Sequence, residues 1–328
     1  MTRPLVSVCM PTYNYGHYLE EAIRSVFAQT YRPLELIVVD DGSTDNTSAV
    51  LEEVVANAPI PVKVVMGDHR GVAATLNKAL KSSRGEWICI LAADDVATPE
   101  RVQKQVEAVE AGTVMVHSEY ECIDSKGTRL PYDSSTDLPP ARGAALRSLL
   151  LLQADVRSMT VMIRRTALES QPYDETLPSE DWQSILRLSK VGEIAHVPEA
   201  LVLRRVHLAS ASFTGHRNKS TFSFKEIGLD VLREVTPPDL PLDRVCAIHT
   251  SVVLRNALAL GAFKKVQDGF RQSFDEFPDQ RAFIVAETLK AVPSYFWTHG
   301  IRERMPDGAL RALLKLKAFA IRLRAEKT

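Results

Sequence analysis

Residues 84–99 read Arg-Gly-Glu-Trp-Ile-Cys-Ile-Leu-Ala-Ala-Asp-Asp-Val-Ala-Thr-Pro, and this segment carries the most informative pattern in the chain. The apolar run at 87–91 predicts a strand that is buried on both faces of a sheet. Two carboxylates, Asp94 and Asp95, follow where the chain leaves that strand. Ligands of open α/β sheets bind outside the carboxyl ends of the strands, so this pair can hold Mg²⁺ or Mn²⁺. The alternative is a simple helix start, because Asp and Pro are both common at helix N-termini.

A strand followed by a helix recurs three times before this segment. The predicted strands cover residues 5–10, 34–39 and 62–66, and each precedes a stretch with apolar residues at helical spacing. This alternation predicts a largely parallel, doubly wound α/β sheet with right-handed crossovers. The loop after the first strand, Pro11-Thr-Tyr-Asn-Tyr-Gly16, contains no GxGxxG fingerprint, which weakens any interpretation as a dinucleotide-dependent hydride-transfer enzyme.

A second pair of acids, Asp40 and Asp41, ends the strand predicted at 34–39 and is followed by Gly42. Asp-Gly-Ser is common in turns, which explains Asp41 and Gly42 without any function. Turn chemistry does not require a carboxylate at the last strand position, however. Because parallel strands end at the same edge of a sheet, both acidic pairs are expected to lie on one rim.

Length and composition narrow the class of protein. The chain has 328 residues, enough for one large core with an appendage or for two domains. Its net charge of -1 gives no general attraction to nucleic acid. The four cysteines are far apart and form no CxxC pair, so neither a zinc site nor a disulfide framework is indicated. The sequence shows no leader and no apolar run of membrane-spanning length, and we expect a cytoplasmic protein.

After Asp95 the strict alternation is lost. A strand is predicted at 113–117, an exposed polar loop at 120–141, a short helix at 146–153 and a strand at 159–163. Ser179-Glu-Asp-Trp182 opens a further helix, and its acids suit a helix N-terminus. Past residue 215 the pattern is helical, with helices predicted at 222–235, 242–261, 263–276 and 280–290.

The sequence of residues 308–328 predicts a basic amphipathic helix, with apolar residues at helical spacing surrounded by Lys and Arg. Such a helix can pack on the catalytic domain or on a dimer mate. It can also lie in a membrane interface, held by apolar burial and by anionic lipid. Both alternatives are kept, with packing on protein favoured because most amphipathic helices in soluble chains pack on protein.

Six segments, taken in order, resemble the family 2 glycosyltransferases, which have the GT-A nucleotide-sugar fold. The segments are Val8-Cys-Met-Pro-Thr-Tyr-Asn14, Val38-Val-Asp-Asp-Gly-Ser-Thr-Asp45, Gly71-Val-Ala-Ala-Thr-Leu-Asn77, Arg84-Gly-Glu through Asp94-Asp95, Ser179-Glu-Asp-Trp182 and Arg205-Val-His207. The resemblance implies a Rossmann-like, doubly wound mixed sheet over residues 1–215, with a nucleotide-sugar half at 1–98 and an acceptor half at 99–215. Residues 216–328 then form a helical C-terminal extension.

The resemblance also implies which residues bind the donor. They are Pro11, Thr12, Tyr13, Asn14, Asp40, Asp41, Arg70, Asn77, Ala93, Asp94, Asp95, Arg205 and His207, with Asp94 and His207 as metal ligands. Asp40 would accept a hydrogen bond from the base; the N3–H donor of uracil or thymine suits it, and guanine N1–H is chemically possible. Two alternatives stay open, namely a His207 that only packs at a strand end and an Arg205 that is a solvated charge rather than a diphosphate ligand.

By the same resemblance Asp181 is the general base of an inverting transfer, and Glu180 either binds the acceptor or only favours the helix start. One position departs from the family pattern. The first acid of the family's Asp-x-Asp motif is Ala92 here, and alanine can neither accept a ribose hydroxyl nor hold a metal-bound water. Asp94 alone can suffice, because Mg²⁺ takes only one or two carboxylates and completes its shell with phosphates and waters.

We therefore expect an enzyme that moves a sugar from a UDP- or dTDP-sugar to a hydroxyl of a glycan or lipid-linked glycan, with Mg²⁺ or Mn²⁺ as cofactor, in bacterial surface polysaccharide synthesis. The rival interpretation is a non-catalytic nucleotide-sugar-binding or scaffold homologue, motivated by Ala92. No nucleic-acid partner is expected. The C-terminal helices are expected to support a homodimer or peripheral contact with the inner face of the plasma membrane.

Overall fold

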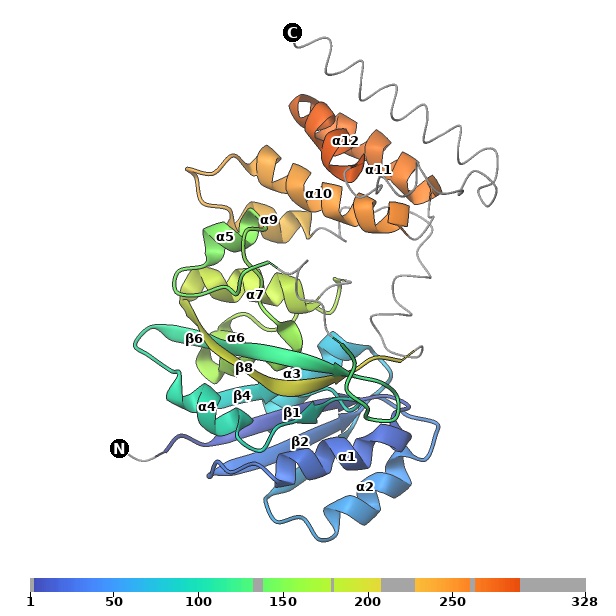
Figure 1. The fold of residues 1–328 in the computed structure, drawn as a ribbon, viewed down its shortest axis with the longest axis vertical. Helices are drawn as coiled ribbons and strands as arrows, with labels where there is room; N and C mark the ends of the chain where they lie inside the picture. The colour runs from blue at the N-terminus through green and yellow to red at the C-terminus, as the bar shows by residue number, and fades with distance from the viewer. Residues whose placement is uncertain (1–2, 132–137, 178–179, 208–227, 260–262, 290–328) are drawn as a thin grey trace. The chain divides into compact units, whose positions relative to one another are not determined.

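The computed structural model describes residues 3–131, 138–177, 180–207, 228–259 and 263–289 (Figure 1). The chain divides into two compact units. The first comprises Met1–Leu149 and Gln153–Leu208, and the second comprises Leu150–Leu152 and Ala209–Thr328. The first unit contains the sheet, and the second is helical in its described part.

One eight-stranded mixed sheet forms the centre of the first unit, in the order β3-β2-β1-β4-β7-β6-β8-β5. Its strands are β1 (Val6–Thr12), β2 (Leu34–Asp40), β3 (Val62–Met66), β4 (Trp87–Ile90), β5 (Val96–Ala97), β6 (Thr113–Ile123), β7 (Met162–Arg164) and β8 (Glu193–Arg205). Strands β1 to β4 are parallel, β7 is antiparallel to both β4 and β6, and β5 is antiparallel to β8. The predicted doubly wound mixed sheet is confirmed.

Helices cover both faces of this sheet (Figure 1). The helices of the first unit are α1 (Gly16–Phe27), α2 (Thr47–Val55), α3 (Val72–Ser82), α4 (Arg101–Glu107), α6 (Arg165–Ser170) and α7 (Glu180–Val191), and the short helix α5 (Leu146–Leu150) belongs to it up to Leu149. Alternate side chains of β1, such as Val6, Val8 and Met10, share one buried cluster with α1 and α2. Helix α3 contacts β1 and β2, and its buried residues lie outside that cluster, which places α3 on the opposite face.

A buried polar network ties the strands together at the edge where β4 begins. Glu35 accepts hydrogen bonds from Ser7 Oγ (2.6 Å) and from the Arg84 backbone N–H (2.7 Å), and its other oxygen binds the Arg84 guanidinium. Burial acts to raise the pKa of Glu35, but these hydrogen bonds outweigh it and hold that pKa below its ordinary value. The Gly85 N–H donates to Ser7 Oγ (2.8 Å). The Arg84-Gly-Glu motif therefore has a structural role, at the end of β4 opposite Asp94.

Several elements differ from the sequence prediction. Strand β6 continues to Ile123, where a loop was predicted from residue 120, because it pairs with β8 over most of its length. Strands β5 and β8 were not predicted. The strand expected at 159–163 is a 3₁₀ turn at Ser158–Thr160 followed by β7. The errors at β6 and β8 share a cause, since half-exposed strands and bulged pairs have weak alternation.

The second unit contains α9 (Leu229–Val235), α10 (Leu242–Ala259), α11 (Phe263–Glu276) and α12 (Arg281–Leu289). Helix α10 contacts the other three helices, and buried apolar side chains fill the space between them. The helices predicted here are confirmed within these bounds. The predicted boundary at residue 215 and the predicted tail at 308–328 lie outside the described residues. No helix of the described chain is both long and apolar enough to cross a membrane.

Candidate active site

Two buried oxygens lie side by side where β1 and β2 end. Thr12 and Asp40 are partners in the parallel register, and the Thr12 carbonyl accepts from the Asp41 N–H (2.9 Å). Asp40 is fully buried, and its Oδ1 accepts from the Ser43 N–H (3.0 Å) and hydroxyl (2.5 Å). Its Oδ2 and Thr12 Oγ1 have no hydrogen-bond partner among the residues that the structure describes. A buried acceptor without a donor is costly, so this pair suits a ligand that brings one.

The neighbours of this pair shape the loops around it. Asp41 accepts from the backbone N–H groups of Arg70 (3.1 Å) and Gly71 (2.8 Å) and so fixes the turn before α3. Asn14 has a positive φ of 58°, and its Oδ1 accepts from the Thr44 N–H (2.8 Å), which joins the loops after β1 and β2. Both side chains therefore hold backbone in place.

Tyr13 and His69 form an exposed aromatic pair above this end of the sheet. Their ring centroids are 4.3 Å apart with a tilt of 31°. His69 Nδ1 lies 3.3 Å from the Asp41 carbonyl oxygen, which anchors the pair at the acidic loop. Pro11, also a predicted donor residue, lies within β1 opposite Val39 and contributes backbone rather than a polar side chain.

The predicted metal ligands meet at the end of β8. The chain turns at residues 92–95, where the Asp95 N–H donates to the Ala92 carbonyl (3.2 Å), and Ala93 is buried in the core. His207 Nε2 lies 3.1 Å from Asp94 Oδ2, and the two side chains are only 7% and 11% exposed. The rings of Tyr15 and Tyr18 enclose the imidazole, with centroids at 5.7 and 5.0 Å.

This pair fits a divalent cation that is shared with a phosphate ligand. Two ligands on neighbouring positions of a Mg²⁺ shell are roughly 3 Å apart, close to the separation of the Asp94 and His207 atoms. No group of three or more His, Cys, Asp or Glu side chains in the described chain is arranged to hold a metal ion. The remaining ligands of a cation here would therefore be water and ligand phosphates, as Mg²⁺ prefers.

Asp95 and Arg205 lie behind the Asp94–His207 pair. The Asp95 carboxylate accepts from the Arg205 backbone N–H (2.8 Å), and burial together with the neighbouring Asp94 raises the pKa of Asp95 to about 7. The Arg205 side chain is 1% exposed, so the alternative of a solvated charge is wrong. Its guanidinium donates hydrogen bonds to three protein oxygens.

Arg70 and Asn77 contact the segment that leads to α7. The Asn77 side chain donates to the Tyr173 carbonyl (2.8 Å) and accepts from the Tyr173 N–H (3.0 Å). The Arg70 guanidinium pairs with Glu175 (2.5 Å), which also accepts from Asn77 (3.1 Å). Both residues, predicted to bind the donor, thus tie the nucleotide half to the segment before Glu180.

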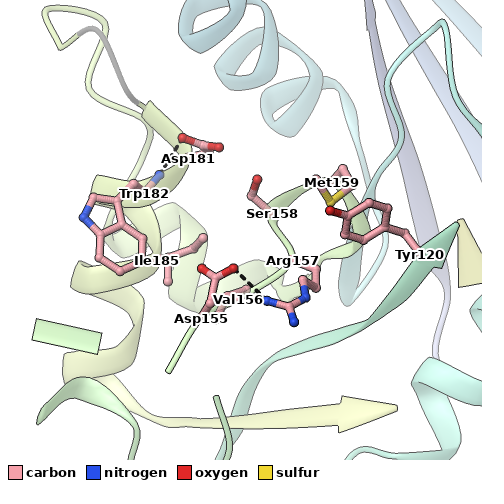
Figure 2. Close-up of a pocket in the computed structure, with 9 residues that line it drawn as sticks. All are labelled: Tyr120, Asp155, Val156, Arg157, Ser158, Met159, Asp181, Trp182 and Ile185. Atoms are coloured by element: carbon pink, nitrogen blue, oxygen red, sulfur yellow. Dashed lines mark hydrogen bonds and ion pairs between the residues drawn. The ribbon is translucent and has the colours of Figure 1, made fainter. Parts of the chain in front are cut away.

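Asp181 lines a pocket of about 190 Å³ in the first unit (Figure 2). The other lining residues are Tyr120, Asp155, Val156, Arg157, Ser158, Met159, Trp182 and Ile185. Asp181 accepts from the Trp182 N–H (2.7 Å) at the start of α7. Burial, and then the charge of Asp181, raise the pKa of the adjacent Glu180 to about 7.

The floor of the pocket is polar and was not predicted. Arg157 pairs with Asp155 (2.8 Å) and Glu119 (3.3 Å), and Glu119 also binds His196 Nε2 (2.8 Å). His117 Nδ1 accepts from the Arg157 N–H (3.3 Å), and burial lowers the pKa of His117 to about 4, so the ring is neutral. The only sequence signal was an Asp and an Arg inside an otherwise apolar stretch.

Comparison with known proteins agrees with this arrangement. The sequence profile of "Glycosyl transferase family 2" matches residues 7–171. An uncharacterized glycosyltransferase of Rickettsia felis is 29% identical over 64% of this chain and 35% of its own length. One from Rickettsia prowazekii is 30% identical over 64% of this chain and 67% of its own length. This chain therefore spans about a third of the length of the first relative.

Solved structures share the fold. The crystal structure of S. aureus TarS 1–349 in complex with UDP-GlcNAc has a TM-score of 0.60 at 20% identity, over 88% of this chain and 81% of that chain. The mannosyltransferase PcManGT from Pyrobaculum calidifontis, in complex with GDP-Man and Mn²⁺, has a TM-score of 0.52 at 17% identity, over 98% of this chain and 81% of that chain. The profile match over half of the sequence, with the fold and rim described above, shows that the chain belongs to glycosyl transferase family 2.

Proposed function

We propose that this glycosyltransferase moves a sugar from a nucleoside-diphosphate sugar to a hydroxyl group of a glycan or glycolipid, with inversion at the anomeric carbon. The observation that carries the proposal concerns Oδ2 of buried Asp40, which has no hydrogen-bond partner among the described residues. It lies at the end of the sheet toward which the Asp94 turn also leads. An N–H group of the nucleotide base would satisfy Asp40, and a cation bound to the diphosphate would lie against Asp94.

The donor's base is proposed to bind at the end of β2. Asp40 Oδ2 would accept the N3–H of uracil or thymine, and Thr12 Oγ1 lies on the neighbouring strand. The exposed Tyr13–His69 pair offers an aromatic face beside it. The fold neighbours include one complex with UDP-GlcNAc and one with GDP-Man. Uracil is favoured because its single N3–H needs only the Asp40 acceptor, and guanine is the alternative that a binding experiment must include.

Asp94 and His207 would hold Mg²⁺ or Mn²⁺ against the donor diphosphate. When bound, the cation neutralises the charge that develops on the leaving diphosphate. Tyr15 and Tyr18 keep the imidazole in place and exclude water from one side of it.

The acceptor is proposed to enter the pocket beside Asp181. Asp181 takes the proton of the acceptor hydroxyl while its oxygen attacks the anomeric carbon on the face opposite the diphosphate. Trp182 and Tyr120 line the same pocket and suit the apolar face of a sugar ring. Glu180, with a pKa near 7, can donate a hydrogen bond to the acceptor while it is protonated.

Isothermal titration calorimetry with UDP, dTDP and GDP, each with and without Mn²⁺, tests the donor site. We expect UDP or dTDP to bind more tightly than GDP, and Mn²⁺ to bind measurably only when the nucleotide is present. Asp40→Asn should weaken nucleotide binding without lowering the melting temperature. Failure of all three nucleotides to bind would contradict the proposal.

The second candidate is a homologue that binds nucleotide sugars without turning them over. Ala92 favours it, because this position cannot supply the ribose contact. Hydrolysis of UDP-sugars by the purified chain separates the two candidates. Binding with Mn²⁺ but no hydrolysis or transfer, across a panel of UDP- and dTDP-sugars, would favour the non-catalytic function.

The biological setting is proposed from the family alone. We expect a role in bacterial surface polysaccharide synthesis, with the 308–328 sequence packing on protein or contacting a membrane. Sedimentation of the full chain, and of a chain ending at Pro306, with anionic liposomes decides between these contacts. Salt-sensitive binding that is lost on truncation supports the membrane contact; a change in oligomer size supports the homodimer.

A further inference from the structure

Arg205 is the last residue of β8, and its side chain binds three separate parts of the first unit. Nε donates to the Asp94 carbonyl oxygen (2.9 Å), Nη1 to the Asp124 carbonyl oxygen (3.2 Å) and Nη2 to the Glu21 carboxylate (2.6 Å). Its guanidinium carbon lies 4.7 Å from the centre of the Tyr18 ring. With 1% exposure, the charge is enclosed by these groups.

The same residue fixes the turn at 92–95 from two directions. Its backbone N–H donates to the Asp95 carboxylate, while its side chain binds the backbone of Asp94. His207 follows two residues later and reaches Asp94 Oδ2. The position of Asp94 relative to His207 therefore depends on Arg205, since both ends of that contact are attached to it.

A direct contact between Arg205 and the donor diphosphate disagrees with this geometry. Each of the three guanidinium nitrogens already donates to a protein oxygen, and the group is nearly inaccessible. Lysine cannot reproduce the arrangement, because its ammonium is a point charge and lacks the planar fork that reaches three acceptors at once.

We propose that Arg205 is a positioning residue that sets the Asp94–His207 pair for the cation, and that it does not bind the diphosphate. This inference rests on the proposed function, because it assumes that the pair receives a cation together with the donor. Glu21 contributes to the same positioning role, because among the described residues its carboxylate is the only one that pairs with the Arg205 guanidinium. Asp94 is thereby held firmly although the neighbouring Ala92 offers no carboxylate.

Two substitutions test the role, each with a matched control on α1. Arg205→Lys is compared with Arg24→Lys, since Arg24 is exposed and pairs only with exposed Glu20 in the described chain. Glu21→Gln is compared with Glu20→Gln, because the two glutamates are adjacent and similarly exposed, at 56% and 55%. Glu21→Gln also provides a test if Arg205→Lys fails to fold.

The first readout is Mn²⁺ affinity in the presence of saturating UDP, measured by calorimetry and by the Mn²⁺ EPR signal. The second readout is the affinity of UDP and of uridine without metal. We expect Arg205→Lys to weaken Mn²⁺ binding about 10–100-fold, as outer contacts of metal ligands do, and Glu21→Gln to weaken it less. Metal-free UDP and uridine should bind as in the wild type, and both controls should be unchanged.

Unchanged Mn²⁺ affinity in folded Arg205→Lys and Glu21→Gln would overturn the inference. So would a loss of metal-free UDP affinity larger than that for uridine, because it would show a direct diphosphate contact. A wild-type chain that binds neither UDP nor Mn²⁺ would overturn the proposed function itself, and with it the inference.

Discussion

The side-chain amide of Asn77 binds both the N–H and the C=O of Tyr173, 96 residues further along the chain. Asn77 lies on α3, which packs against β1 and β2, the strands that carry the proposed base site, and Tyr173 precedes the helix that carries Asp181. This contact joins α3 to the segment before α7, and because it is made to backbone groups it does not depend on the side chain at position 173.

Asn77→Asp should impair turnover more than donor binding. The carboxylate cannot donate to the Tyr173 carbonyl and faces Glu175, so the segment before α7 loses about 1–3 kcal/mol of anchoring. We expect a lower melting temperature and a lower kcat with nearly unchanged UDP affinity. A large loss of metal-free UDP affinity would instead show that Asn77 contacts the donor, as the family resemblance implies.

Asp94→Asn should abolish metal-dependent transfer while the fold remains, because a neutral amide is a much weaker ligand for Mg²⁺ or Mn²⁺. Activity across a Mn²⁺ titration and the melting temperature are the measurements. Exposed Asp68→Asn is the control and should behave as the wild type. Turnover near the wild-type value would show that Asp94 does not hold the cation.

Asp181→Asn should lower kcat by on the order of 10²–10⁴, the range expected when a general base is lost, with UDP affinity retained. Single-turnover kinetics and calorimetry measure the two quantities separately. If UDP affinity falls in parallel with kcat, Asp181 belongs to the donor site and the base lies elsewhere.

Glu180 should make the protein less stable as pH rises from about 4.5 to about 7. Its native pKa, near 7, exceeds the ordinary value of 4.5 because the site is buried and lies beside Asp181. Between these values the native state binds more protons than the unfolded chain, so the free energy of unfolding falls with rising pH. The resulting loss in the free energy of unfolding is at most about 3 kcal/mol, because the site is partly exposed. Glu180→Gln should remove this loss. Urea unfolding at pH 4.5, 6 and 7.5 measures it, and an unchanged pH slope in the variant would contradict the burial of the charge.

Ala92→Asp should tighten the binding of UDP if the turn keeps the usual ribose geometry, because the new carboxylate can accept a ribose hydroxyl. Calorimetry measures the UDP affinity of the variant and of the wild type, each with and without the metal. Unchanged affinity would mean that the turn at 92–95 differs in shape as well as in side chain.

The first half of the fold was predictable because β1, β2 and β4 are buried on both faces and are followed by turn residues, which gives a strong local signal. Strand β8 and the part of β6 beyond residue 117 were not predictable, since β6 and β8 gain their stability from each other through a bulged pairing that no local window contains. The family resemblance predicted Asp94 and His207 as a pair, and the structure places their side chains 3.1 Å apart. The partners of Arg205 could not be found from sequence, because Glu21, Asp94 and Asp124 are brought together only by the sheet order.

Gly85 lies where an added side-chain carbon would come within 2.5 Å of the Ser7 backbone nitrogen, in the network of Glu35 and Arg84. Substitutions at Gly85 should therefore reduce the amount of folded protein in a cell while leaving the specific activity of the surviving molecules unchanged. A mutational scan scored by total activity will mark Gly85 as strongly as Asp94, although the two lie at opposite ends of one strand. Normalising each variant to its abundance will separate Gly85, which acts through folding, from Asp94, which is proposed to act in the reaction.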